Sequence, residues 1–168
     1  MSVLPSIRVF PDPVLRQKSI EVTHFDETLN RLIKGLSKVM ESQRHGIGIA
    51  AAQIGVLKRV ALVDISSRVP GAKRLILINP AILDAKRERN SREGCMSLPD
   101  YTGSLIRYDE IVIRYQDMSR RTQTYKAEGL EAICIQHEMD HMSGVLFFDR
   151  VSHLKRDLIP RAWRRQAN

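Results

Sequence analysis

The residues best placed to do chemistry lie in the segment Gln136-His137-Glu138-Met139-Asp140-His141, which contains the pattern His-Glu-x-x-His. On a helix, His137 and His141 stand one turn apart on the same face and can bind one divalent metal ion from the same side. Glu138 lies beside them, where a carboxylate can take a proton from water held by the metal. The pattern therefore indicates a hydrolytic metal centre, with two histidines buried by chance as the alternative.

The helix that carries these histidines is predicted to run from about Gly129 to Met142, with Gly144 placed to end it. Leu130, Ile133 and Cys134 continue the same helix face as the two histidines. We therefore expect the metal site to point inward, toward a core, and not toward solvent.

A catalytic site of this type needs a third protein ligand and an open position for water. Helix geometry argues against Cys134, which at 1.5 Å per residue lies roughly 10 Å along the axis from His141. Cys95 is the better candidate, because it follows Gly94 in a segment, 92–99, that reads as a tight turn or irregular crossing. An ordinary buried thiol and a nucleophilic cysteine with a histidine partner remain as alternatives.

The remaining elements predict an α+β domain of mostly antiparallel short strands packed around the metal-binding helix. Helical spacing of apolar residues indicates an N-terminal amphipathic helix from about Asp26 to Gln43. Strand-like runs follow at 59–65, at 75–79 with Pro80 as its end, and at 81–88, 104–108, 110–115 and 122–127. A basic helix is expected at the C-terminus.

Length and charge narrow the function classes. The chain has 168 residues and a formal net charge of +8, which suits one domain over residues 1–168 with a basic surface. No apolar run approaches the ~18 residues of a membrane helix, and residues 1–10 do not resemble a secretory signal. We therefore expect a cytoplasmic protein with no membrane partner and no specific DNA partner. The basic tail at 155–168 is a candidate for ribosome contact.

Three segments together resemble the motifs of the peptide deformylase family: Gly46-Ile47-Gly48-Ile49-Ala50-Ala51-Ala52-Gln53, Glu93-Gly94-Cys95-Met96-Ser97 and the His-Glu-x-x-His segment. The resemblance implies that Cys95, His137 and His141 are the metal ligands. It implies Glu138 as general acid and base, with Gln53 and the backbone N–H of Met96 holding the oxyanion. It places Ile47, Gly48 and Gly94 along the substrate backbone, and Glu93, Leu130, Ile133 and Cys134 around the methionine side chain.

The function implied by the resemblance is hydrolysis of N-formylmethionyl nascent peptides with release of formate. Fe(II) is the implied native metal, and zinc, nickel or cobalt are substitutes. Two other functions stay open: a zinc endopeptidase, which would use a third His or Glu and leave Cys95 dispensable, and a non-catalytic ribosome-binding domain. The resemblance is incomplete at Thr102, near which many relatives carry an arginine that touches the substrate, so contacts beyond methionine are not predicted.

Overall fold

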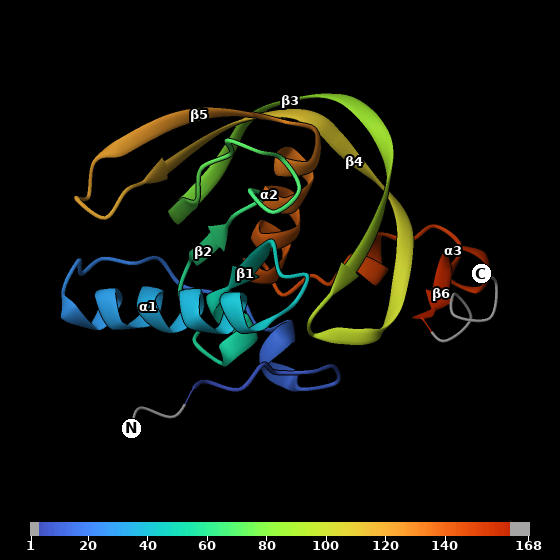
Figure 1. Cartoon of the computed structure of the whole chain (residues 1–168), viewed down its shortest axis with the longest axis horizontal. Helices are drawn as coiled ribbons and strands as arrows, with labels where there is room; N and C mark the ends of the chain where they lie inside the picture. The colour runs from blue at the N-terminus through green and yellow to red at the C-terminus, as the bar shows by residue number, and fades with distance from the viewer. Residues whose placement is uncertain (1–3, 162–168) are drawn as a thin grey trace.

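The computed structural model describes residues 4–161. Its centre is helix α2 (Gly129–Met142), which lies inside a curved antiparallel sheet (Figure 1). It contacts the strands β1 (Gly48–Ala50), β2 (Val60–Val63), β4 (Leu98–Gln116) and β5 (Thr122–Glu128). The boundaries of α2 agree with those predicted from the sequence. Gly144 follows the helix with a positive φ of 72°, and a Cβ there would stand 2.5 Å from the carbonyl oxygen of Arg16, so glycine is required both for the turn and for the close approach.

Burial of α2 extends further round the helix than a single apolar stripe would require. Glu131, Gln136, Glu138 and Asp140 are buried together with the apolar residues. Most of these polar side chains have partners. Gln136 bonds the backbone of Tyr108 through both ends of its amide, and Glu131 accepts a hydrogen bond from the Tyr125 hydroxyl. The helix is therefore anchored to the sheet by hydrogen bonds as well as by apolar packing.

The predicted amphipathic helix is α1 (Glu27–Ser42). Asp26 caps it, because its carboxylate accepts hydrogen bonds from the backbone N–H groups of Thr28 and Leu29. Its apolar face packs on β1 and β2 and is formed by Leu29, Ile33, Leu36, Val39 and Met40.

The sheet has the order β1-β2-β3-β4-β5, with β6 pairing on β4, and every pairing of named strands is antiparallel. The strands are β1 (Gly48–Ala50), β2 (Val60–Val63), β3 (Leu75–Cys95), β4 (Leu98–Gln116), β5 (Thr122–Glu128) and β6 (Leu158–Pro160). Short 3₁₀ helices occur at η1 (Pro13–Arg16), η2 (Ala51–Ile54) and η3 (Phe147–Arg150). The α+β class is confirmed.

The sequence suggested that Pro80 ends a strand, but in the structure it does not. β3 runs through it, and the register against β4 shifts between Ile78 and Ala81. A proline is tolerated at such an irregularity because its missing N–H breaks no regular ladder bond. Asn79, with a φ of 51°, holds the bend by bonding the backbone N–H and carbonyl of Val22 at 2.8 and 2.9 Å. Likewise, the predicted strands at 104–108 and 110–115 are parts of the single strand β4.

The C-terminal segment is only partly helical in the described residues. It forms the single turn α3 (Leu154–Asp157), after which β6 pairs with residues 101–103 of β4. Pro160 has no N–H for a helix, and Leu158 and Ile159 before it are paired in the sheet. The rest of the predicted basic helix, 162–168, lies outside the described residues. No helix in the described part of the chain is long and apolar enough to cross a membrane.

Candidate active site

The sulfur of Cys95, at the end of β3, meets the two histidines of α2. The Cys95 Sγ lies 3.3 Å from the Nε2 of His141. One ligand atom from each of Cys95, His137 and His141 falls within 4.8 Å of the other two. The i, i+4 spacing on α2 supplies two of these groups, and the tight turn at Met96 and Ser97 that joins β3 to β4 brings the third.

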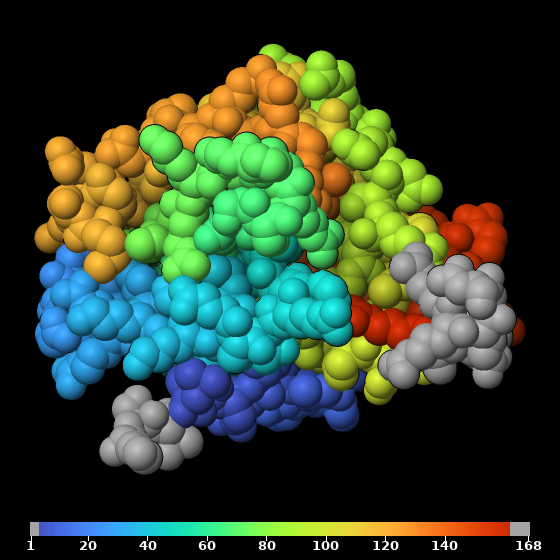
Figure 2. Space-filling model, in the orientation of Figure 1, coloured from blue at the N-terminus to red at the C-terminus, as the bar shows by residue number. Residues whose placement is uncertain are grey.

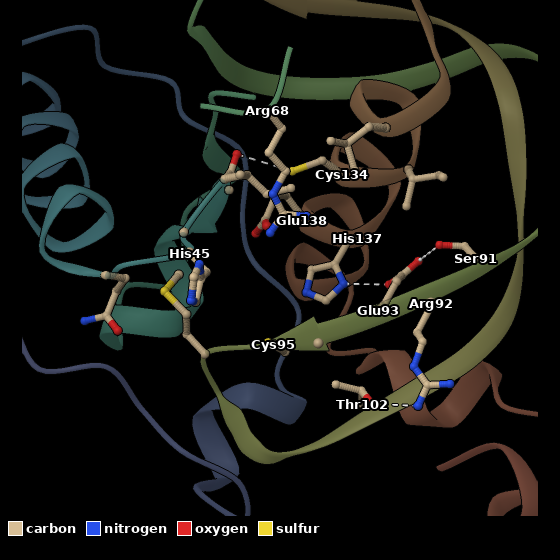
Figure 3. A pocket seen from close by; sticks show the side chains of 18 of the residues that line it. His45, Arg68, Ser91, Arg92, Glu93, Cys95, Thr102, Cys134, His137 and Glu138 are labelled. Atoms are coloured by element: carbon tan, nitrogen blue, oxygen red, sulfur yellow. Dashed lines mark hydrogen bonds and ion pairs between the residues drawn. The ribbon is translucent and has the colours of Figure 1, made fainter. Parts of the chain in front are cut away.

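Glu93 fixes the ring of His137. The His137 Nδ1 lies 2.8 Å from the Glu93 carboxylate (Figure 3), which leaves Nε2 as the nitrogen available to a metal. Arg107 holds the same carboxylate through two bonds of 2.7 and 3.0 Å. Burial by itself would raise the pKa of Glu93, but the hydrogen bonds from His137 and Arg107 outweigh burial and lower that pKa to about 2.

The surroundings of Cys95 favour ionisation of its thiol. Burial opposes its ionisation, but the charge of His141 and hydrogen bonds from both histidines outweigh burial and lower the pKa of the thiol well below its usual value. Gln53 donates from Nε2 to the Cys95 Sγ at 3.5 Å and to the Ser97 hydroxyl at 3.2 Å. The Gln53 side-chain oxygen accepts from the Ala50 N–H at 2.9 Å, so the orientation of its amide is fixed.

Glu138 is buried beside this cluster, with 3% of its surface exposed. Burial raises the pKa of its carboxyl to about 7, which suits a group that must both accept and donate a proton near neutral pH. Three buried side-chain atoms of the described residues have no hydrogen-bond partner, and two of them, the Glu138 Oε2 and the His141 Nδ1, belong to this cluster.

These features test whether the residues fit a metal. Buried polar atoms nearly always have a hydrogen-bond partner. A buried carboxylate oxygen without one, beside three side-chain atoms that can bind a metal, is therefore what a metal site that also holds a solvent molecule requires. One thiolate and two imidazoles are a donor set that suits Fe(II), zinc and related ions. The site therefore fits a single divalent metal ion.

A cavity of about 690 Å³ opens onto the cluster. Its lining includes all of the proposed catalytic and substrate-binding residues: Ile47, Gly48, Gln53, Glu93, Gly94, Met96, Leu130, Ile133, Cys134 and Glu138. Cys95 and His137 also line it, whereas His141 is buried and is not among the lining residues. Cys134 is not part of the ligand cluster, and its thiol is directed to the Ile47 carbonyl at 3.4 Å.

Comparison with known proteins agrees with this geometry. The family described as polypeptide deformylase matches residues 4–157. The chain is 41% identical to the peptide deformylase of Rhizobium meliloti, over 99% of this chain and 95% of the relative. The chain belongs to the polypeptide deformylase family. The peptide deformylase of Heliobacterium modesticaldum is 44% identical, over 84% of this chain and 90% of the relative.

Solved structures of peptide deformylases have the same fold. One from Legionella pneumophila superposes with a TM-score of 0.85 at 36% identity, covering 92% of this chain and 89% of that one. One from Synechococcus elongatus, in complex with actinonin, has a TM-score of 0.82 at 37% identity, covering 91% and 82%. The enzyme is thus a metal-binding hydrolase that removes the formyl group from the N-terminal formylmethionine of new polypeptides.

Glu93 was predicted only to border the methionine pocket, but in the structure of this deformylase it also binds His137 and Arg107. It lines the cavity, but both of its oxygens are bound, to Arg107 and His137. Sequence reasoning did not single out Arg107. A signal was present, because strand alternation places Arg107 on the same face as the buried Leu105, and a charge that faces inward must have a partner.

Gly48 of the deformylase lies directly against the catalytic groups. A Cβ at this position would stand 2.5 Å from the Glu138 Oε1 and 2.6 Å from the Cys134 Sγ. We expect Gly48→Ala to displace the Glu138 carboxylate and lower kcat/KM for a formylated peptide by about 10²-fold, the cost of a misplacement near 1 Å. Gly35→Ala is the control, because its Cβ would meet only Pro5 at an ordinary 3.7 Å. Equal activity of the two variants would contradict the prediction.

Proposed function

We propose that Cys95, His137 and His141 hold one Fe(II) ion and that Glu138 moves the protons in the hydrolysis of N-formylmethionyl peptides. The observation that carries this proposal is the meeting of the Cys95 sulfur with the paired histidines beside a buried, unpartnered Glu138 oxygen. Zinc, nickel or cobalt are expected to bind the same donor set. Purification without oxygen, followed by elemental analysis of the active enzyme, tests the identity of the metal.

The residues divide the reaction between them. When bound, the metal polarises the formyl carbonyl and makes a nearby water more acidic. Glu138 accepts a proton as the water oxygen adds to the formyl carbon, and the Gln53 Nε2 and the Met96 N–H donate to the oxyanion that forms. The C–N bond then breaks, Glu138 returns the proton to the amine nitrogen, and formate and a free N-terminus remain.

Substrate selection follows from the shape of the cavity. Leu130, Ile133 and Cys134 on α2 provide an apolar wall for the methionine side chain. Among the described residues, no strand pairs with residues 91–95 of β3 on the side away from β4. An extended peptide can add there and bond the backbone near Gly94, which would make binding tolerant of sequence.

Cys95 distinguishes this proposal from a zinc endopeptidase with the same helix motif. We expect Cys95→Ala to lose the bound metal and, with it, formate release, because one of three protein ligands is gone. Cys134→Ala is a matched control. It also removes a buried thiol from this cavity, but that thiol is not part of the ligand cluster. Metal content by elemental analysis is the readout, and full occupancy in Cys95→Ala would refute the ligand set.

The partners are proposed as nascent chains at the ribosome, in the cytoplasm. The basic residues Lys155 and Arg156 are exposed and support contact with ribosomal RNA through the tail. The assignment of residues 1–168 to one catalytic domain with a tail at 155–168 stays a prediction. Co-sedimentation with ribosomes at low salt tests the proposed contact between the tail and ribosomal RNA. Equal binding by the full chain and by a Lys155→Gln, Arg156→Gln double variant would reject it.

A further inference from the structure

Strand β6 brings a C-terminal arginine to the active-site cavity. Leu158, Ile159 and Pro160 pair with Gly103, Thr102 and Tyr101 of β4, and Gly94 of β3 pairs with Thr102. Three strands therefore lie side by side at the mouth of the site, and the C-terminal segment lies against the hairpin of β3 and β4 (Figures 1 and 2). Arg161 follows β6 directly and lines the same cavity as Cys95 and His137.

The guanidinium of Arg161 lies over the backbone of Gly94. A Cβ added to Gly94 would stand 2.5 Å from the Arg161 Nη2 and 3.5 Å from its Cζ. The positive charge therefore lies against the part of β3 beside which the substrate backbone is proposed to lie. The neighbouring Arg92 is turned to the Thr102 hydroxyl at 3.1 Å (Figure 3).

The side chains at the mouth of the cavity carry mainly positive charge. Arg44, Arg68 and Arg161 line the cavity and form no ion pair with any described residue. The acidic residues in the described lining are Glu93 and Glu138, and both are buried. Glu93 is already neutralised by Arg107. A peptide that enters this mouth therefore meets uncompensated positive charge after its methionine.

We propose that Arg161 binds a carboxylate that follows the methionine, so that the enzyme prefers formylated peptides with Asp or Glu at the second or third residue. The inference rests on the proposed function and adds to it the selection of residues beyond methionine. Guanidinium and carboxylate are matched in shape and charge, and Arg161 is exposed enough to meet an incoming peptide. The carboxylate can belong to a side chain or to the end of a short peptide.

The test compares formate release from C-terminally amidated peptides at low salt. Formyl-Met-Asp-Ser-amide and formyl-Met-Ser-Asp-amide are measured against the same peptides with Lys in place of Asp. Formyl-Met-Ala-Ser as a free acid and as an amide separates a terminal carboxylate from a side-chain one. The proteins are the wild-type enzyme, Arg161→Met and the control Arg156→Met, which removes an equal charge from the same segment but at a residue bound to Asp157.

We expect the wild-type enzyme to favour Asp over Lys in kcat/KM by about threefold to tenfold, since an exposed charge attracts one peptide and repels the other. The ratio should fall to near one in Arg161→Met, remain in Arg156→Met, and shrink at 1 M salt, where the Debye length is about 3 Å.

A ratio near one in the wild-type enzyme, an unchanged ratio in Arg161→Met, or an equal loss in Arg156→Met would overturn the proposal. A preference for the free acid alone would assign the site to chain ends and overturn the selection of acidic side chains. If the enzyme released formate from none of these peptides, the proposed function would be overturned, and this inference with it.

Discussion

Glu138→Gln is expected to lower kcat for a formylated peptide by about 10²–10⁴-fold, the range for loss of a general acid and base. Glutamine has the size of glutamate, so the packing around this buried position is kept, but its amide cannot accept the proton of the attacking water. The metal should stay bound, because Glu138 is not among the three clustered ligands. Formate release and metal content, measured on the same preparation, check both parts.

Glu131→Gln is a matched control for that variant. Glu131 is on the same helix and is also buried, but it bonds the Tyr125 hydroxyl, as an amide oxygen still can, and it does not line the active-site cavity. It should retain turnover close to that of the wild-type enzyme. If metal-loaded Glu138→Gln kept kcat within tenfold of the wild-type value, Glu138 would have no role in proton transfer.

Arg107→Met is expected to lower the free energy of unfolding by about 3–5 kcal/mol, the cost of breaking a buried ion pair. Arg107 is 4% exposed, and it holds both Glu93 oxygens and, at 2.7 Å, the Asp140 carboxylate. Methionine fills a similar volume but leaves buried negative charge without its partner. For a chain of this size the Tm should fall by roughly 6–20 °C.

The control for Arg107→Met comes from the same hairpin. Arg89 bonds Asp109 at the same distance of 2.7 Å, but its side chain is 51% exposed. Arg89→Met should therefore cost less than about 1 kcal/mol, because solvent screens the pair. Urea unfolding of both variants at equal metal occupancy is the measurement. Similar losses of stability in the two variants would show that burial does not explain the contribution of the Arg107 ion pairs to the free energy of unfolding.

The network around Arg107 also links stability to the metal site. Arg150 donates to both oxygens of Asp140 at 2.6 Å, so Asp140 joins two arginines, and Arg107 in turn joins it to Glu93 and the His137 ring. Groups that orient a metal ligand in this way typically change metal affinity by about 10–100-fold when removed. The same arginine that holds α2 to β4 therefore also supports the orientation of a proposed metal ligand.

The sequence by itself determined the local elements that carry the chemistry. The helical spacing of His137 and His141, the apolar periodicity of α1 and the glycine after α2 all act within a few residues, so periodicity and residue type were sufficient to predict α1, α2 and the paired imidazoles. Cys95 was proposed as the third ligand because it follows Gly94 in a turn-like segment and because the family resemblance implies it, whereas no local pattern predicts that it meets the helix.

Only the tertiary structure decided which distant groups meet. Cys95 and His141 are 46 residues apart, and Glu93 and His137 are 44 apart, so their contacts depend on how β3 crosses α2. Strand continuity through Pro80 is set by the pairing of β3 with β4, and α2 is buried all round because the sheet encloses it. A periodic pattern states which face of an element is apolar, but not which surface will cover it, and for that reason the partners of Arg107 and the position of Arg161 became visible only once the chain was folded.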